Sequence, residues 1–295
     1  MLKLNGVVPP MITPFDAEGN VDFEMLKKLV AFLKDNVDGL FICGSYGSGP
    51  LMSPEERKKV TEITLEVVAS KIPVICHTGT TNTRDTVDLT RHAEQVGCHG
   101  ASAVGPYYYR HDEENVLAFY GEMVKSVKPD FPIYVYHNPK FSGYGMSLGT
   151  LKKLKQLGIS GIKDATFDIL LLANYMRELS DDDFDVVLGT EAMWLSACAL
   201  GAQAFMPGLG NAFPEICRKM HREGMAQEIE TCRQTQFEVN RLRDIMYFAK
   251  STQLAVYVML EIREIISAYP RAPFLPAGQK EKDDIKQALI QSGAL

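Results

Sequence analysis

The sequence lacks the features that would place this protein in a membrane or on a nucleic acid. It has no stretch of about 18 or more apolar residues, so a membrane-spanning helix is not expected. Its net charge of −6 comes without any block of like charges, which argues against nucleic acid or an anionic membrane as partner. The opening residues show no export signal, with neither a charged segment nor a long apolar run. We therefore expect a cytoplasmic protein with a small-molecule partner.

Cysteine is present in small number and in no pattern that suggests disulfide or metal chemistry. The six cysteines form no CxxC pair and no Cys/His spacing typical of zinc sites. We expect reduced thiols, most of them buried, and neither a metal nor another cofactor. They are Cys43, Cys76, Cys98, Cys198, Cys217 and Cys232.

What the sequence does contain is a long alternation of two kinds of segment. Hydrophobic residues make up 46% of the 295 residues and charged residues 23%, as in a globular protein with a large core. Up to about residue 214, short runs rich in Val, Ile and Phe alternate with amphipathic segments, which is typical of repeated βα units. Eight strands are predicted, at 7–12, 39–43, 73–76, 100–104, 133–136, 161–163, 185–188 and 204–206.

The segments between these strands predict helices, among them 22–34, 54–69, 83–95, 113–125 and 148–157. Strands separated by one helix each must be parallel, and eight in succession can close into a barrel. The sequence thus predicts an α/β protein, a (β/α)8 TIM barrel over 1–225. A C-terminal helical extension over 226–295 would pack on it, with helices at 227–249 and 252–268. An open doubly wound sheet remains the alternative at this point.

Two side chains at neighbouring strand ends suggest chemistry, since barrel enzymes act at the C-terminal ends of their strands. Lys163 ends a strand that looks buried, and burial lowers a lysine pKa, which leaves an amine able to attack a carbonyl. Tyr136 ends the preceding strand, about 4.8 Å away, and could donate a proton there. A solvated lysine and a core tyrosine are the structural alternatives when each residue is considered alone.

The loop after the second strand, 44–49, is rich in glycine and serine. Glycine lets the backbone approach a ligand, and the amides of Ser45 and Tyr46 could hold a carboxylate. His77 and His137 also lie near strand ends, which leaves a metal-dependent class II aldolase as an alternative. Neither has an evident set of carboxylate co-ligands, so an ordinary polar lining is favoured.

With these residues in view, the chain resembles the dihydrodipicolinate synthase / N-acetylneuraminate lyase family of class I aldolases. The resemblance runs from GVVPPMITP near the start to the helical C-terminus. GSYG at 44–47 is similar to the family's GTTGE loop, YHNP at 136–139 to its YN-x-P, and GIKDAT at 161–166 to its GIKEAT.

The resemblance implies a role for each matching residue. Lys163 would form an imine with pyruvate or a related 2-keto acid, with Tyr136 as catalytic tyrosine and Ser45 as the relay and carboxylate-binding hydroxyl. Tyr108 would complete the relay of a neighbouring subunit, because the family is typically a homotetramer built as a dimer of dimers. Substrate contacts are expected from Tyr46, Gly47, Thr80, Phe141, Gly189, Glu191 and Gly208, and Asn211 matches an asparagine near the last strand.

Departures from the family pattern leave the substrate open. Tyr46 replaces the usual threonine and would push a phenol into the pocket, and Ser48 replaces a glutamate. Phe141 stands where dihydrodipicolinate synthases place the arginine that binds a distal carboxylate, so aspartate semialdehyde would lack its partner. Ala192 departs from the sialic acid lyase pattern, so that activity is not implied.

The leading interpretation is therefore a class I lyase, an aldolase or dehydratase acting on pyruvate or a 2-keto-3-deoxy acid. A condensing enzyme similar to dihydrodipicolinate synthase, with an altered carboxylate site, is the alternative in the same class. A non-catalytic relative that only binds a keto acid is the alternative in another class, and the presence of both Lys163 and Tyr136 argues against it.

Overall fold

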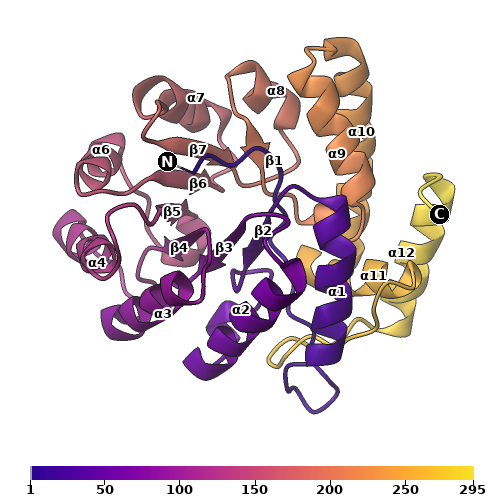
Figure 1. The fold of residues 1–295 in the computed structure, drawn as a ribbon. Coiled ribbons are helices and arrows are strands. Elements are labelled where there is room, and N and C mark those ends of the chain that lie inside the picture. Colours follow the sequence, from indigo (N-terminus) through magenta and orange to yellow (C-terminus); the bar gives the residue numbers. More distant parts are fainter. Residues whose placement is uncertain (1) are drawn as a thin grey trace.

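A computed structural model describes residues 2–295 and shows eight parallel strands surrounded by helices (Figure 1). The sheet order is β1-β8-β7-β6-β5-β4-β3-β2, and a parallel bridge between Pro10 and Phe41 joins its two ends. The chain is therefore a closed (β/α)8 barrel, as predicted, and not an open doubly wound sheet. The strands are β1 (Gly6–Val7), β2 (Leu40–Ile42), β3 (Val74–His77), β4 (Gly100–Val104), β5 (Ile133–His137), β6 (Gly161–Asp164), β7 (Asp185–Leu188) and β8 (Ala204–Phe205).

The first strand is shorter than the predicted 7–12. Pro9 and Pro10 have no amide hydrogen, so they cannot donate to a ladder. The chain nevertheless continues along β2, because Phe41 donates to the Pro9 carbonyl at 3.1 Å and Met11 donates to the Phe41 carbonyl at 2.9 Å. These two bonds close the barrel where regular strand geometry has ended.

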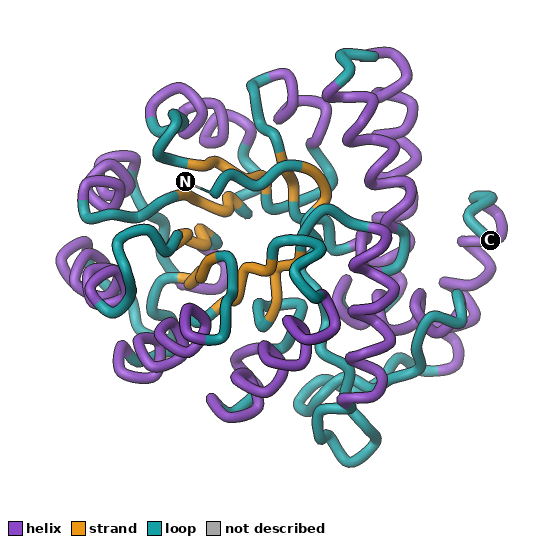
Figure 2. Tube along the Cα trace, in the orientation of Figure 1, coloured by secondary structure: helices purple, strands orange, loops and turns teal. Residues whose placement is uncertain are grey.

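The helices surround the strands, and Figure 2 shows them as an outer ring with the C-terminal helices on one side. One of them begins at a capping box: the Ser53 hydroxyl accepts from the Glu56 amide, and the Glu56 carboxylate accepts from the Ser53 amide. The helices of the barrel are α1 (Phe23–Asn36), α2 (Pro54–Val68), α3 (Thr83–Gln95), α4 (Glu113–Lys125), α5 (Pro139–Ser142), α6 (Leu148–Gln156), α7 (Ile169–Glu178), α8 (Trp194–Ala199) and α9 (Pro214–Met225).

Three further helices follow α9: α10 (Ile229–Ile245), α11 (Thr252–Ile262) and α12 (Gln279–Gln291). The prediction of 252–268 was too long, and α12 was not predicted. Helix α10 packs against α8 and α9. The Gln236 side chain ties it to α8, where it accepts from the Leu195 amide, and to the loop after β7, where it donates to the Glu191 carbonyl. The division at residue 226 stays a prediction, and residue 1 lies outside the described part. No helix within residues 2–295 is long and apolar enough to cross a bilayer.

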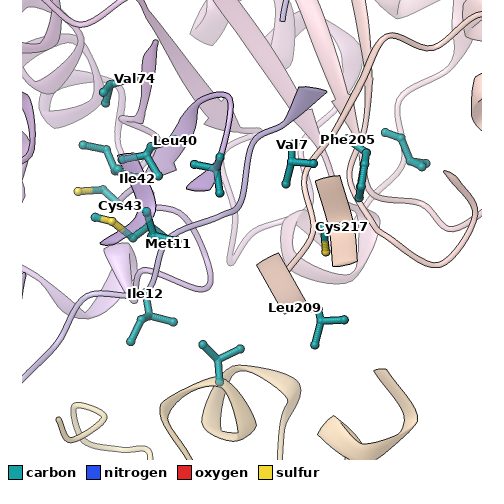
Figure 3. Close-up of a cluster of buried hydrophobic side chains, with 14 of the residues drawn as sticks. Val7, Met11, Ile12, Leu40, Ile42, Cys43, Val74, Phe205, Leu209 and Cys217 are labelled. Atoms are coloured by element: carbon teal, nitrogen blue, oxygen red, sulfur yellow. The ribbon is translucent and has the colours of Figure 1, made fainter. Parts of the chain in front are cut away.

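Buried side chains form two separate layers, because neighbouring residues of a strand point to opposite faces. One layer fills the space between strands and helices, and Figure 3 shows Val7, Leu40, Ile42, Val74 and Phe205 within it. The other fills the barrel interior and includes Phe41, Ile75, Tyr134, Tyr136 and Val187. The residues of the interior layer are therefore those whose side chains point to the barrel axis.

The N-terminal end of the barrel is closed by the first residues of the chain. Leu4 belongs to the interior layer, and its amide donates to the Asp185 carboxylate at 3.0 Å. The Tyr134 hydroxyl lies 3.0 Å from the same carboxylate oxygen and 3.2 Å from the Leu2 carbonyl. Polar groups at this end are therefore satisfied by each other, and any substrate must enter from the opposite end.

Candidate active site

Lys163 lies in the barrel interior near the open end. Its register partners are Tyr136 on β5 and Val187 on β7, both members of the interior layer. Adjacent Ile162 belongs instead to the layer under the helices. The strand alternation therefore points the lysine side chain to the barrel axis, although only 3% of the residue is exposed.

The surroundings of Lys163 are aromatic rather than acidic. Its Nζ lies 3.8 Å from the centre of the Phe41 ring and 4.3 Å from the centre of the Tyr136 ring. Within the described chain it forms no salt bridge. Burial without a compensating carboxylate lowers the pKa of Lys163 to about 7. A substantial fraction of the amine is therefore neutral and nucleophilic near neutral pH.

Tyr136 presents its hydroxyl to the same space. The hydroxyl accepts a hydrogen bond of 3.2 Å from the Asn138 Nδ2, which leaves its own proton available. Burial raises the pKa of Tyr136, while the nearby Ser45 and Asn138 side chains offset part of that rise. The phenol is thus a neutral proton donor beside the amine.

The loop after β2 has a backbone that only some residues tolerate. Cys43 and Ser48 both have a positive φ, and a Cβ at position 49 would collide with the Cys43 carbonyl. In residues 2–295 the amides of Ser45 and Tyr46 donate to no acceptor. Two unused donors beside the lysine fit the predicted carboxylate site.

A single cavity of about 700 Å³ brings most of the predicted site residues together. Gly47, Thr80 and Tyr108 are not part of its wall. The Gly47 carbonyl accepts from the Thr13 hydroxyl, and the Thr80 hydroxyl donates to the Asn82 carbonyl. The predicted residues that line the cavity are Ser45, Tyr46, Tyr136, Phe141, Lys163, Gly189, Glu191 and Gly208.

Tyr108 lies on the surface, 83% exposed, with its ring edge-on to Tyr109 at 5.0 Å. Its φ of 82° is unusual for a bulky residue, and such backbone strain is often found at functional sites. Adjacent Tyr107 does line the cavity. A single subunit therefore leaves Tyr108 without a role at its own site.

Tyr46 does not block the cavity as its size suggested. Its hydroxyl lies 2.8 Å from the Thr252 hydroxyl, at the start of α11. The ring occupies space left by Gly208, since a Cβ there would collide with the phenol. Burial, followed by the nearby Glu191 carboxylate, raises the pKa of Tyr46, which keeps the phenol neutral. Ser48 is likewise held by α11, where its hydroxyl accepts from Gln253 at 2.7 Å.

Two histidines that could have suggested a metal are engaged elsewhere. The His77 Nε2 accepts from the Val104 amide at 2.9 Å, and the His137 Nε2 accepts from the Met146 amide at 3.0 Å. Those lone pairs are not available to a metal. Asn211, which the sequence placed near the last strand, instead clamps the backbone at Ile12, Pro10 and Gly208.

Other residues of the site were missed by sequence reasoning. Phe41 could have been predicted, because it lies on the face of β2 that points into the barrel, but no motif marks it. Asn138 could have been found as the residue that follows Tyr136 by two. Phe167, Arg243, Tyr247 and Lys250 also line the cavity, and three of them come from the C-terminal helical region, where no family motif lies.

The barrel and its lysine-centred cavity define a Schiff-base lyase on a TIM-barrel fold. The chain belongs to the dihydrodipicolinate synthetase family, whose model matches residues 3–292. It is accordingly an enzyme of the class that joins a lysine to pyruvate or another 2-keto acid as an imine.

Relatives of known name share nearly the full length of the chain. A 4-hydroxy-tetrahydrodipicolinate synthase of Methanosarcina mazei is 27% identical over 98% of this chain and 99% of that protein. Among solved structures, the dihydrodipicolinate synthase DapA-2 of Bacillus anthracis is 27% identical, with a TM-score of 0.91, over 98% of this chain and 99% of that one. CdNal of Clostridium difficile, solved with mannosamine, is 25% identical, with a TM-score of 0.92, over 99% of this chain and 100% of that one.

Proposed function

We propose that Lys163 is the residue that forms the imine, and that the substrate is pyruvate or a 2-keto-3-deoxy acid. The neutral Nζ attacks the keto carbon, forming a C–N bond while the carbonyl oxygen becomes a hydroxyl. Loss of that hydroxyl as water gives the imine, which accepts the electron pair of the neighbouring C–C bond when that bond breaks. In a dehydration it accepts instead the electron pair of a C–H bond next to the imine carbon, and the resulting enamine expels a hydroxyl further along, which leaves as water with a donated proton. No metal is needed for this electron sink.

In this proposal Tyr136 moves the protons. It donates to the departing hydroxyl and later takes the proton from the substrate hydroxyl on the carbon that is released as an aldehyde when the C–C bond breaks. The free amides of Ser45 and Tyr46 hold the carboxylate next to the keto carbon, and the Ser45 hydroxyl links Tyr136 to solvent or to a neighbour. Asn138 supports the phenol from the other side, through its bond of 3.2 Å.

One observation carries the proposal. Lys163 is a buried amine without an acidic partner in the described chain, its pKa falls to about 7, and it is in register with Tyr136 inside a cavity. A lysine with a purely structural role would be expected to bury its charge against a carboxylate. A non-catalytic keto-acid-binding relative would need neither the neutral amine nor the proton donor beside it.

Borohydride trapping tests this assignment. Treatment with pyruvate and borohydride should inactivate the enzyme and leave a reduced adduct on the peptide that contains Lys163. Lys153, on the surface of α6, offers the matched control, since Lys153→Ala should trap normally while Lys163→Ala does not. An adduct on a different lysine, or none in any variant, would rule out the assignment.

We further propose a homotetramer built as a dimer of dimers, in which Tyr108 acts at the site of a neighbour. Three successive tyrosines, 107–109, follow β4, and two of them are largely exposed in a single chain. Tyrosine suits an interface because its ring is apolar and its hydroxyl can hydrogen-bond. A cytoplasmic location is proposed on the six free thiols, which suit a reducing compartment.

Subunit complementation tests the role of Tyr108. Tyr108→Phe and Lys163→Ala are expected to be weak or inactive alone. When subunits exchange, a mixed dimer has one site with an intact Lys163 and an intact Tyr108 from its partner, so activity should return. Complete exchange, verified by mass, without recovered activity would show that Tyr108 serves no site across an interface.

A further inference from the structure

The outer part of the cavity carries more positive than negative side chains. Lys140 on α5, Arg243 on α10 and Lys250 before α11 line the same cavity as Lys163. The only carboxylate in the described wall is Glu191, which is buried and accepts from the Gly208 amide at 3.2 Å. With three cationic side chains and one carboxylate, this part of the cavity wall carries a net positive charge.

Arg243 is held in a defined orientation. Its Cζ lies 5.4 Å from the centre of the Phe167 ring and 5.3 Å from the centre of the Tyr247 ring, and its Nε lies 3.6 Å from a Glu191 oxygen. Contact with two aromatic rings restricts a guanidinium without using its hydrogen-bond donors. The Arg243 Nη groups have no hydrogen-bond partner elsewhere in the described chain. They are therefore preorganised and unused.

The two lysines, unlike Arg243, have no acidic partner within residues 2–295. The Lys140 Nζ lies 5.7 Å from the centre of the same Phe167 ring, and neither Lys140 nor Lys250 takes part in a salt bridge. Phe167 has a φ of 61°, a backbone conformation that costs energy in a bulky residue, and its ring faces both Lys140 and Arg243. This ring thus brings two cations to one side of the cavity.

We propose that this group of Lys140, Arg243 and Lys250 binds a second anionic group, a carboxylate or a phosphate, at the far end of the substrate. The proposal rests on the proposed function, because the first carboxylate and the keto carbon are held at Ser45, Tyr46 and Lys163. Phe141 removes the cation that the family places in the loop after β5. Here the positive charge comes mainly from the C-terminal helices, which shifts the anion site towards α10.

Imine trapping on matched acids tests the proposal without requiring a known reaction. The probes share a six-carbon chain: 2-oxohexanoate ends in a methyl group and 2-oxoadipate in a carboxylate. A second pair, 2-keto-3-deoxygluconate and its 6-phosphate, compares a hydroxyl with a phosphate. In each pair, the anionic member is the one with a charged far end and the neutral member the one without, although both carry the carboxylate next to the keto carbon. The concentration for half-maximal borohydride trapping should be about tenfold or more lower for each anionic member, because a hydrogen-bonded charge pair contributes about that much.

Variants assign the effect to the cations. Arg243→Gln should reduce the preference for the anionic member by about tenfold to hundredfold. The concentrations for half-maximal trapping of the neutral member and of pyruvate should change little. Arg241→Gln, on the exposed face of the same helix, is the control and should change nothing. Added salt should weaken trapping of the member with the charged far end more than trapping of the other member, because both carry the carboxylate next to the keto carbon. The pair with the larger preference identifies the anion as carboxylate or phosphate.

The outcomes separate this inference from the proposed function. Failure of pyruvate itself to trap would overturn the proposed function. Normal trapping of pyruvate with equal trapping of the two members in both pairs would overturn the anion site alone. So would pyruvate trapping without any trapping of the six-carbon acids, or an Arg243→Gln variant that weakens neutral and anionic members equally.

Discussion

The two ends of strand β5 carry the same side chain in opposite circumstances. Tyr134 and Tyr136 are two residues apart and both point into the barrel. At the closed end, the Tyr134 hydroxyl is engaged by Asp185 and the Leu2 carbonyl. At the open end, Tyr136 accepts one bond from Asn138 and faces a cavity that contains an amine. The Tyr134 hydroxyl is therefore engaged within the fold, whereas the proton of the Tyr136 hydroxyl stays available to a ligand in the cavity.

The charged groups at the two ends differ in the same way. Burial raises the pKa of Asp185, but the Leu4 amide and the Tyr134 hydroxyl offset that rise. Burial lowers the pKa of Lys163 to about 7, and no partner opposes the shift. The closed end therefore satisfies its buried charge, whereas the open end leaves Lys163 without a partner, as is typical of a functional site.

The largest expected effect is at Lys163. Lys163→Ala should reduce turnover to the background rate, because no other amine in the described chain lies in register with Tyr136. Stability should not fall, since the variant removes a buried amine that has no ion pair. Thermal unfolding and trapping on the same preparation check both claims. A variant that unfolds readily would show that the open end also holds the barrel together.

Tyr136→Phe should lower turnover by about 10²- to 10⁴-fold, the usual contribution of a positioned proton donor. Some imine should still form, because the amine remains. Single-turnover trapping and steady-state rates together separate these steps. An unchanged rate would place Tyr136 with Tyr134, as a structural side chain.

The pH dependence should reveal the unpaired amine. Below the Lys163 pKa of about 7, the rate of imine formation should fall about tenfold per pH unit, because only the neutral amine attacks. The folded pKa lies below the unfolded value of about 10.4, so between these values the unfolded chain binds the extra proton and stability should rise with pH. Denaturant unfolding at pH 7.5 and 9.5 checks the sign, and Lys163→Ala should show a smaller rise.

The smallest expected effect is at the closed end. Tyr134→Phe should cost about 1–2 kcal/mol of unfolding free energy, the value of one lost hydrogen bond to a buried carboxylate. Its turnover per folded molecule should match that of the natural sequence. Chemical denaturation combined with an active-site titration measures both. A loss of turnover larger than the loss of folded protein would mean that the two ends are coupled.

The barrel could be predicted because its signals are local. Alternating apolar runs and amphipathic segments fix strands and helices, and 83–95 and 113–125 match α3 and α4 as observed. The first strand was misjudged because Pro9 and Pro10 look apolar but cannot donate. The last part of 252–268 was misjudged because its apolar residues continue past α11, where they pack in an irregular segment.

The site could be predicted only where strand order alone brings residues together. Lys163 and Tyr136 are neighbours in any barrel with this order of strands, so their meeting follows from sequence position. Arg243 and Thr252 reach the cavity through the packing of α10 and α11, which no periodicity encodes. The path of the Tyr46 phenol depended in turn on Gly208, more than 160 residues away in the chain, and a contact of that kind is invisible in one sequence.

Tyr46 and Gly208 consequently constrain how this enzyme can change over evolutionary time. A side chain at position 208 would collide with the phenol, so a substitution there requires the Tyr46 ring to move or to be replaced. A threonine at position 46 would remove the collision and at the same time free Thr252 from its bond with the phenol. A smaller residue at position 46 therefore makes room for a larger one at position 208, so substitutions at the two positions are expected to depend on each other.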